Sequence, residues 1–296
     1  MQIGLAGTGK MGSAIVRRLL GSGHAVWVWN RNEARAQPLL QAGARWCASP
    51  RALAQACDTV ITMLTDEAAI DRVYSGTDGL LTAAHSQHLF IDMSTVQPAK
   101  PQALGTLAAA AGAHFLECPV GGSVGPAAEG KLLGFVGGAA PDLERARELL
   151  NLLCRRVEHV GALGAGATVK LAINLPLMVY WQTLSEALSL LQPLGLEPAR
   201  IIELLADTSG GPNMLKTRGP MIAKALAGTA DGSVSVDLAT MSKDLRAMLA
   251  QGAAGHYRLP LAALTLQSME QAAAQGLAGA DCTQLPVWWL QTGGRV

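Results

Sequence analysis

The sequence lacks the features that mark secreted and membrane proteins. Its few cysteines have no C-x-x-C spacing, which predicts buried reduced thiols and excludes a disulfide framework or a zinc site. The uncharged run 171–185 contains Asn174 and Pro176 and falls short of the roughly 20 apolar residues that a membrane helix needs. No basic segment precedes the first apolar stretch, so we expect no signal peptide and a cytoplasmic protein. The cysteines are Cys47, Cys57, Cys118, Cys154 and Cys282.

Charge is also scarce. Charged residues make up 15% of the 296 residues and the formal net charge is +1, which gives no electrostatic argument for nucleic acid or an anionic membrane as a partner. Half of the residues are hydrophobic, which predicts a large core or large subunit interfaces. We therefore expect a homodimer or a homotetramer, between which the sequence does not choose. Core packing is the other explanation for the apolar residues.

The first half of the chain alternates short apolar strands with helical patterns. Such alternation is typical of βαβ units and a parallel sheet. Long helical patterns replace it further along the chain, with no strand pattern of comparable quality. The predicted strands are QIGLA, AVWVW, TVITML, HLFIDM, AHFLEC and LLGFVGG. The predicted helices are 11–21, 33–42, 50–56, 101–111, 141–153, 167–191, 198–206, 220–227, 238–250 and 261–275.

The pattern changes from alternating strands and helices to helices alone at a glycine-rich segment, 161–166. We therefore predict an α/β fold class in which a Rossmann-type doubly wound domain, 1–162, is followed by an all-helical domain, 163–296. A long helix would join the two. In this organisation the second domain would contribute residues to a site at the end of the parallel sheet.

The segment GLAGTGKMG carries the pattern Gly7-x-Gly9-x-x-Gly12 between a predicted strand and a predicted helix. This context makes the pattern a dinucleotide-binding fingerprint, because each glycine has a task. Gly7 permits the tight turn, Gly9 lets the backbone approach a pyrophosphate, and Gly12 allows close packing of helix and strand. Free N–H groups at the helix N-terminus would hold the diphosphate. Thr8, Lys10 and Met11 belong to the same cofactor-binding loop.

The second predicted strand ends at Asn30, followed by Arg31. NAD-specific sites place Asp or Glu here to bind the ribose 2′-hydroxyl, whereas an arginine accommodates a 2′-phosphate. Asn30 removes the repelling carboxylate and Arg31 offers a fork of donors. We therefore predict NADP(H) in preference to NAD(H). A solvated loop arginine is the alternative.

Lys170 begins the uncharged run, and Asn174 lies one helical turn later. A partly desolvated lysine has a lowered pKa, so its amine can exchange a proton with an alcohol near neutral pH. The Asn174 amide could hold the same hydroxyl, because residues four apart share a helix face. From these residues alone, a lysine that snorkels to water is an equally good interpretation.

Four further motifs follow the glycine loop in order. They are DMSTVQP (92–98), PVGGSVGPAAEGKL (119–132), GAGATVKLAIN (164–174) and SKDL (242–245). Over nearly the whole chain the sequence resembles the β-hydroxyacid dehydrogenase family, which includes 3-hydroxyisobutyrate dehydrogenases, tartronate semialdehyde reductases and glyoxylate/succinic semialdehyde reductases. The resemblance implies an oxidoreductase that moves hydride between NADP and a short hydroxy acid or semialdehyde acid, with no metal.

The resemblance also implies roles for single residues. Lys170 matches the catalytic lysine of the family, and Asn174 and Ser94 match positions that contact the substrate. The matches to cofactor-contacting positions are Leu64, Thr65, Thr95 and Lys243.

The loop expected to bind the substrate carboxylate departs from the family pattern. It reads Gly121-Gly122-Ser123 where the usual order is Ser-Gly-Gly, so the hydroxyl lies two places further along. Backbone N–H groups in such a turn still form an anion-binding concavity. Lys131 could pair with a second anionic group, with a solvated loop lysine as the alternative. The substrate therefore stays open, including a sulfonate-bearing acid.

Two other functions fit the same architecture. One is an imine reductase, a class that typically lacks the lysine. The other is an NADP-binding sensor or interaction module without turnover. Retention of Lys170 favours the dehydrogenase.

Overall fold

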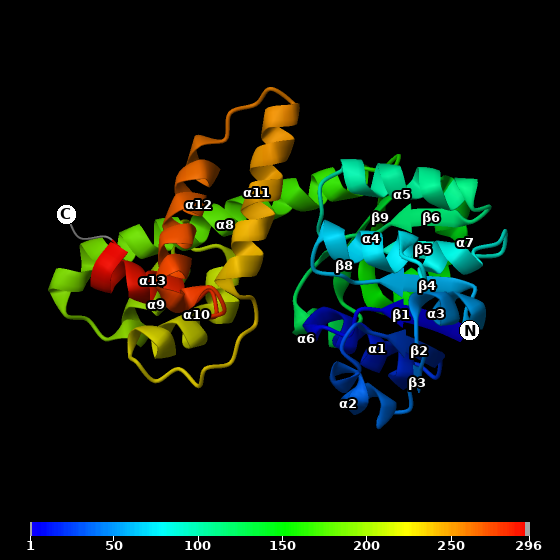
Figure 1. Cartoon of the computed structure of the whole chain (residues 1–296). Coiled ribbons are helices and arrows are strands. Elements are labelled where there is room, and N and C mark those ends of the chain that lie inside the picture. The colour runs from blue at the N-terminus through cyan, green and yellow to red at the C-terminus, as the bar shows by residue number, and fades with distance from the viewer. Residues whose placement is uncertain (1, 294–296) are drawn as a thin grey trace. The chain divides into compact units, whose positions relative to one another are not determined.

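The computed structural model describes residues 2–293, which form two compact units that divide within one helix, between Leu171 and Ala172. Figure 1 shows the strands in the N-terminal unit and a helical C-terminal unit. Within the described residues, no helix is long and apolar enough to cross a membrane.

The N-terminal unit contains a parallel sheet in the order β3-β2-β1-β4-β5-β6. This is the strand order of a Rossmann fold, whose dinucleotide crevice opens where the order reverses, here between β1 and β4. The strands are β1 Gln2–Ala6, β2 Ala25–Trp29, β3 Arg45–Trp46, β4 Thr59–Thr62, β5 Leu89–Asp92 and β6 His114–Glu117. The Rossmann prediction is therefore confirmed.

Three more strands extend this sheet beyond β6. Strand β8 (Leu132–Gly137) runs antiparallel to β6 and to β7 (Val120–Gly121), and parallel to β9 (Cys154–Gly161). Strand β9 was not predicted, because it lies at the sheet edge and carries the exposed pair Arg155 and Arg156 directly after Cys154. An edge strand with charged side chains avoids pairing with another chain, and it lacks the apolar pattern of a buried strand.

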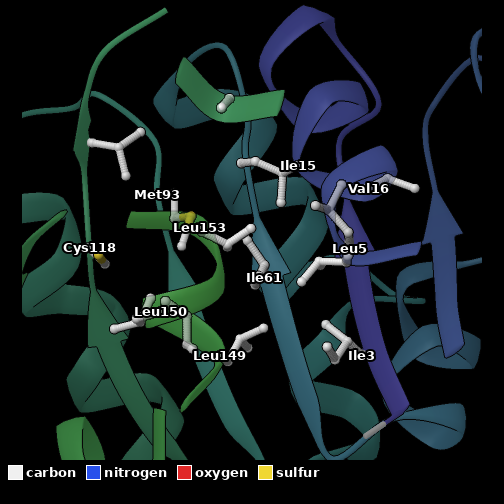
Figure 2. Packing of buried hydrophobic residues seen from close by; sticks show 14 of the residues in the cluster. Ile3, Leu5, Ile15, Val16, Ile61, Met93, Cys118, Leu149, Leu150 and Leu153 are labelled. Atoms are coloured by element: carbon white, nitrogen blue, oxygen red, sulfur yellow. The ribbon is translucent and has the colours of Figure 1, made fainter. Parts of the chain in front are cut away.

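Helices cover both faces of the sheet, which makes the unit doubly wound. Adjacent strand residues point to opposite faces, so Ile61 packs on one side with α1 and α7, and Val60 packs on the other with α3, α4 and α5. Figure 2 shows α7 leucines, among them Leu149 and Leu153, beside Ile61 on the first side. The helices are α1 Lys10–Gly21, α2 Gln37–Leu40, α3 Pro50–Ala56, α4 Glu67–Ser75, α5 Ala99–Ala110, α6 Val124–Glu129 and α7 Ala140–Leu153, with short turns at Glu33–Arg35 and Leu80–Ala83.

The C-terminal unit is helical, as predicted, and its described residues contain no strand beyond one isolated bridge, Asp237–Asp281. Its helices are α8 Ala165–Leu191, whose first turns belong to the N-terminal unit, α9 Pro198–Ala206, α10 Asn213–Leu226, α11 Leu238–Ala254, α12 Pro260–Ala272 and α13 Gln284–Trp288, with short segments Gln192–Leu194, Ala273–Leu277 and Trp289–Gly293.

Helix α10 corrects one prediction, because it begins well before Pro220 and carries that proline inside it. Leu215, in the early turns, is fully buried, and a Cβ on Gly219 would come within 2.8 Å of Ile202 on α9. A proline usually begins a helix or interrupts one, so the residues before Pro220 were predicted as a loop. Close packing against α9 stabilises these residues as helical turns.

Candidate functional site

The β1–α1 loop has the geometry that its glycine pattern predicts. Gly7 has a φ of 106°, and a Cβ there would overlap the Met63 carbonyl. A Cβ on Gly12 would overlap the Gly7 carbonyl. A Cβ on Gly9 meets no atom within 4 Å, so the backbone faces open space where a ligand can approach.

The N-terminus of α1 is suited to an anion. Among the described residues, no side chain caps it and no acidic residue lies in its first turn. Uncapped N–H groups and the helix dipole both favour negative charge. Beside them, the buried Thr8 Oγ1 has no hydrogen-bond partner within the described part of the chain. The loop therefore fits the diphosphate of a dinucleotide, and the residues that would hold it are Thr8, Gly9, Lys10, Met11 and Gly12.

Asn30 connects the end of β2 to this loop. Its Oδ1 accepts a hydrogen bond from the Thr8 N–H at 3.1 Å, and its Nδ2 donates to the Asn32 carbonyl at 2.8 Å. Arg31 is exposed next to it. The position that carries a carboxylate in NAD-specific Rossmann domains is therefore neutral here and braces the phosphate loop.

A buried polar network joins the ends of β4 and β5. The Asp92 carboxylate accepts from Thr62 Oγ1 at 2.6 Å and from Ser94 Oγ at 2.7 Å. Ser94 Oγ in turn accepts from the Leu64 N–H at 2.9 Å. Burial raises the pKa of Asp92, and the two hydroxyl donors partly offset that effect. The network fixes the segment that carries Leu64 and Thr65 relative to the one that carries Ser94 and Thr95.

This network restricts the role predicted for Ser94. Its side chain is 2% exposed and its single hydroxyl proton is directed at Asp92, so it can meet another group only as an acceptor. Any donor to a substrate acid must therefore come from elsewhere. Asp92 begins the DMSTVQP motif but was not among the predicted site residues, because a carboxylate at a strand end gives no sign of its partners in the sequence.

The glycine loop after β7 is exposed and conformationally restricted. Gly122 has a φ of 128°, and a Cβ there would lie 2.8 Å from Leu132 Cδ2. Ser123 precedes α6, and its exposed side chain makes no capping hydrogen bond. Lys131 pairs with Glu129 at 2.7 Å on the surface, which supports the solvated-lysine interpretation.

Lys170 lies in the second turn of α8, within the N-terminal unit, and is 8% exposed. The start of α8 is attached to the end of β6, where the Glu117 carboxylate accepts hydrogen bonds from the backbone N–H groups of Gly164, just before the helix, and of Gly166 and Ala167 in its first turn. The structure thus places Lys170 at the carboxyl edge of the sheet, with the phosphate loop, Asn30 and the ends of β4 and β5. Glu117 was not among the predicted site residues.

Two predicted site residues belong to the C-terminal unit. Asn174 is half-buried, one turn after Lys170 on α8. Lys243, on α11, forms an ion pair with Asp244 at 2.8 Å.

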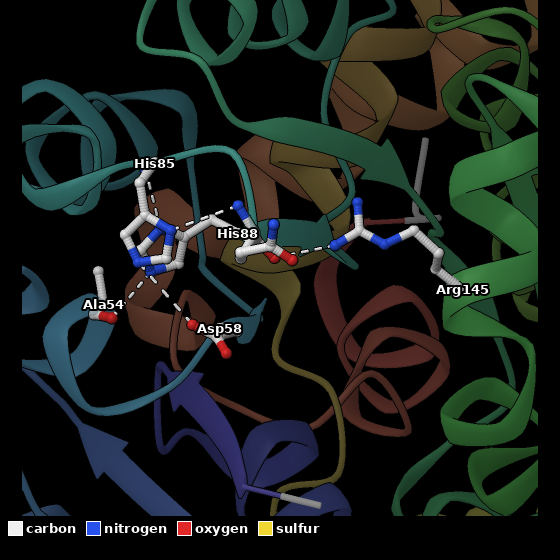
Figure 3. A network of polar contacts seen from close by, with 6 residues as sticks. Ala54, Asp58, His85, His88 and Arg145 are labelled. Carbon is white, nitrogen blue, oxygen red and sulfur yellow. Dashed lines mark hydrogen bonds and ion pairs between the residues drawn. The ribbon is translucent and has the colours of Figure 1, made fainter.

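One group of side chains in the described residues has the composition of a metal site: Asp58, His85 and His88. Figure 3 shows that the ring nitrogens of His88 already face backbone groups of the protein. His88 Nδ1 accepts from the His85 N–H at 3.0 Å, and Nε2 lies 2.8 Å from the Ala54 carbonyl. Both ring nitrogens are therefore occupied by backbone groups, so the buried His88 has no lone pair for a metal. It ties α3 to the segment that leads into β5.

Comparison with known proteins agrees with this geometry. Residues 2–161 match the model of the NAD binding domain of 6-phosphogluconate dehydrogenase. Residues 164–288 match the model described as NAD-binding of NADP-dependent 3-hydroxyisobutyrate dehydrogenase. The chain belongs to the β-hydroxyacid dehydrogenase family. It is an NAD(P)-dependent oxidoreductase of the hydroxyacid dehydrogenase kind.

Similar proteins span most of the chain. Glyoxylate/succinic semialdehyde reductase 2 of Arabidopsis thaliana is 31% identical over 95% of this chain and 77% of its own length. The 3-hydroxyisobutyrate dehydrogenase of Pseudomonas aeruginosa is 34% identical over 88% of this chain and 89% of its own. The solved complex of Psf3 with NADP+ and 2-OPP has a TM-score of 0.86 at 27% identity, and the match covers 96% of this chain and 99% of that one.

Reductive aminases share the fold at a greater distance. The enzyme from Aspergillus terreus, solved with NADPH and ethyl levulinate, has a TM-score of 0.63 at 21% identity, covering 97% of this chain and 99% of that one. At this identity the likeness concerns the fold alone.

Proposed function

We propose that this β-hydroxyacid dehydrogenase reduces a short semialdehyde acid with NADPH, and oxidises the matching 3-hydroxy acid in reverse, with Lys170 as general acid and base. The observation that carries the proposal is the burial of Lys170 on a helix anchored at the carboxyl edge of the Rossmann sheet. An ammonium group in such a setting is positioned and poorly solvated, which makes its proton available to a reacting oxygen.

The proposed chemistry needs one proton for each hydride. When bound, the nicotinamide supplies or accepts the hydride. In the reduction the Lys170 ammonium gives its proton to the carbonyl oxygen as that oxygen gains negative charge, and in the oxidation the neutral amine takes the proton from the hydroxyl. The Asn174 amide, one turn along α8, would hold the same oxygen.

Asn30 and Arg31 support NADP as the preferred cofactor. A 2′-phosphate would meet a neutral amide and an exposed guanidinium, where a carboxylate would repel it. The NADP+ bound to the similar protein Psf3 agrees with a preference for NADP. Lys243, together with Leu64, Thr65 and Thr95, would contact the rest of the cofactor.

The glycine loop supports a small acid as the substrate. The loop offers the backbone N–H groups of Gly121, Gly122 and Ser123. The Ser123 hydroxyl makes no capping hydrogen bond to α6, so it can donate a further hydrogen bond. Because the proton of Ser94 is directed at Asp92, we assign the acid-binding donors to this loop and leave Ser94 as an acceptor.

We also infer a homo-oligomer in a reducing compartment such as the cytoplasm. Three exposed leucines lie close together in sequence: Leu190 at the end of α8, Leu194 in the turn after it and Leu204 on α9. A second copy of the chain could cover them. All five cysteines are free, buried thiols. Neither nucleic acid nor a membrane is expected as a partner.

A cofactor-oxidation assay over a panel of semialdehyde acids and one imine tests the function. We expect NADPH turnover with at least one semialdehyde acid, and lower kcat/KM with NADH and with the imine. Imine reduction alone would favour the reductive-aminase chemistry. Tight NADPH binding with no turnover across the panel would favour a sensor.

A further inference from the structure

One buried carboxylate joins the end of β6 to the start of α8. Glu117 is the last residue of β6 and is 2% exposed. Its Oε1 accepts from the N–H groups of Gly164 and Gly166 at 2.6 and 2.9 Å, and its Oε2 accepts from Ala167 at 3.0 Å. These donors are the backbone groups that a helix leaves unpaired at its N-terminus.

We propose that Glu117 is the positioning residue for Lys170, because it fixes the first turn of α8 and thereby the direction from which the ammonium reaches the substrate. The proposal rests on the function proposed above.

The surroundings of Glu117 pack closely around the carboxylate. A Cβ on Gly137, in the neighbouring strand β8, would overlap Oε1. A Cβ on Gly166 would lie 3.1 Å from the Glu117 Cδ and would overlap the Phe135 carbonyl. Two glycines therefore make room for one carboxylate, which then accepts three charge-assisted hydrogen bonds in a fixed geometry.

Lys170 follows Ala167 by about one helical turn, a rise of roughly 4.5 Å along the axis. A rotation or shift of the first turn therefore moves Lys170 directly, because the helix continues unbroken between the two residues. The carboxylate also places negative charge near the base of the turn that carries the ammonium. A negative charge close to a lysine favours its charged form.

The ionisation of Glu117 falls in the range where an enzyme works. Burial raises its pKa, and so does the charge of Asp92, its partner in the register of β5 and β6. The three N–H donors lower it, and the net result is a pKa of about 7. Above that pH the carboxylate is ionised and gives the helix both its anchor and its charge.

The test compares Glu117→Gln, Glu117→Asp and Asp142→Asn. The glutamine keeps the shape but removes the charge and directs an NH2 group at one of the N–H donors. Asp142 is the matched control, because it is a buried carboxylate that pairs with His114 at 2.7 Å at the opposite end of the same strand.

For Glu117→Gln we expect a loss of kcat of at least about 10-fold, with the NADPH Kd within about 3-fold of wild type. The alkaline limb of the kcat/KM profile for reduction should move to lower pH by about half a unit or more, since the ammonium loses a stabilising charge. Amide hydrogen exchange at Gly166 and Ala167 should accelerate. Glu117→Asp should restore the alkaline limb and part of kcat, and Asp142→Asn should leave the limb in place.

An unshifted limb in Glu117→Gln, or a loss of kcat no larger than that of Asp142→Asn at equal loss of Tm, would overturn the positioning role. Failure of this inference is distinguishable from failure of the proposed function. If Lys170→Ala is inactive while Glu117→Gln turns over normally, only the inference is wrong. If Lys170→Ala is active, the function itself is wrong, and the exchange rates alone decide whether Glu117 anchors α8.

Discussion

At the scale of single residues, Asn30 has a structural task and is also the residue to which we assign the proposed preference for NADP. Its Oδ1 holds the Thr8 N–H of the phosphate loop, a bond that an aspartate would keep. Its Nδ2 donates to the Asn32 carbonyl, a bond that an aspartate would lose. Replacing the amide by a carboxylate therefore changes the charge beside the ribose and preserves the brace of the loop.

Asn30→Asp should shift cofactor preference toward NADH. We expect the KM for NADPH to rise about 10-fold or more, because a carboxylate repels the 2′-phosphate, and the KM for NADH to fall or stay unchanged. Steady-state kinetics with both cofactors measure the change. Arg31→Ala is the companion variant, which should weaken NADPH alone. Equal effects on both cofactors in Asn30→Asp would mean that this position supports the loop without selecting the ribose.

At the scale of elements, the β1–α1 loop contains two glycines that the fold itself requires and one that it does not require. Gly7 and Gly12 are required by the protein's own backbone, whereas Gly9 faces open space in an extended conformation that any residue adopts. One motif therefore contains glycines with two different reasons to be present.

Gly9→Ala should leave the fold intact and weaken the cofactor. We expect the Tm to stay within about 2 °C of wild type and the NADPH Kd to rise at least about 10-fold, because the new methyl occupies the space of the diphosphate. Gly21→Ala, at the C-terminal end of α1 with open space around it, is the control and should leave the Kd unchanged. Wild-type affinity in Gly9→Ala, measured by calorimetric titration, would contradict the placement of the diphosphate.

Elements with a strong local signal could be predicted from the sequence. The alternation of apolar strands and amphipathic helices gave the Rossmann half, and the bounds of α3 and α9 agree with the predicted ranges. Features that depend on contacts distant in sequence could not be predicted. Strand β9 forms because β8 offers an edge, α10 continues through Pro220 because α9 packs on it, and Glu117 acts through a helix 47 residues further along the chain.

At the scale of the whole molecule, buried titratable groups make stability depend on pH in opposite directions. Burial lowers the pKa of His88 below its usual 6.5 and raises that of Glu117 to about 7. Between the folded and unfolded pKa values, His88 is protonated in the unfolded chain only, whereas Glu117 is protonated in the folded protein only. His88 therefore costs stability as pH falls below about 6.5, and Glu117 costs stability as pH rises from about 4.5 toward 7.

His88→Asn should flatten the acid side of the stability profile. The variant should be less stable than wild type at pH 7.5, since it loses the stacking of His88 on Phe90, but the gap should narrow between pH 6.5 and 5. Calorimetric Tm values of both proteins across this range measure the effect. The control is His256→Asn, an exposed histidine with a φ of 59° that asparagine tolerates. Parallel pH curves for wild type and His88→Asn would show that His88 is not the titrating group.

The central claim is that Lys170 moves the proton in catalysis. The most direct measurement is kcat/KM of Lys170→Ala with NADPH and the best semialdehyde acid, beside the NADPH Kd and the control Lys216→Ala, which removes an exposed lysine from α10. We expect a loss of about 10²-fold to 10⁴-fold in Lys170→Ala with the Kd within a few-fold of wild type, and no loss in the control. Turnover of Lys170→Ala within about 10-fold of wild type would contradict it.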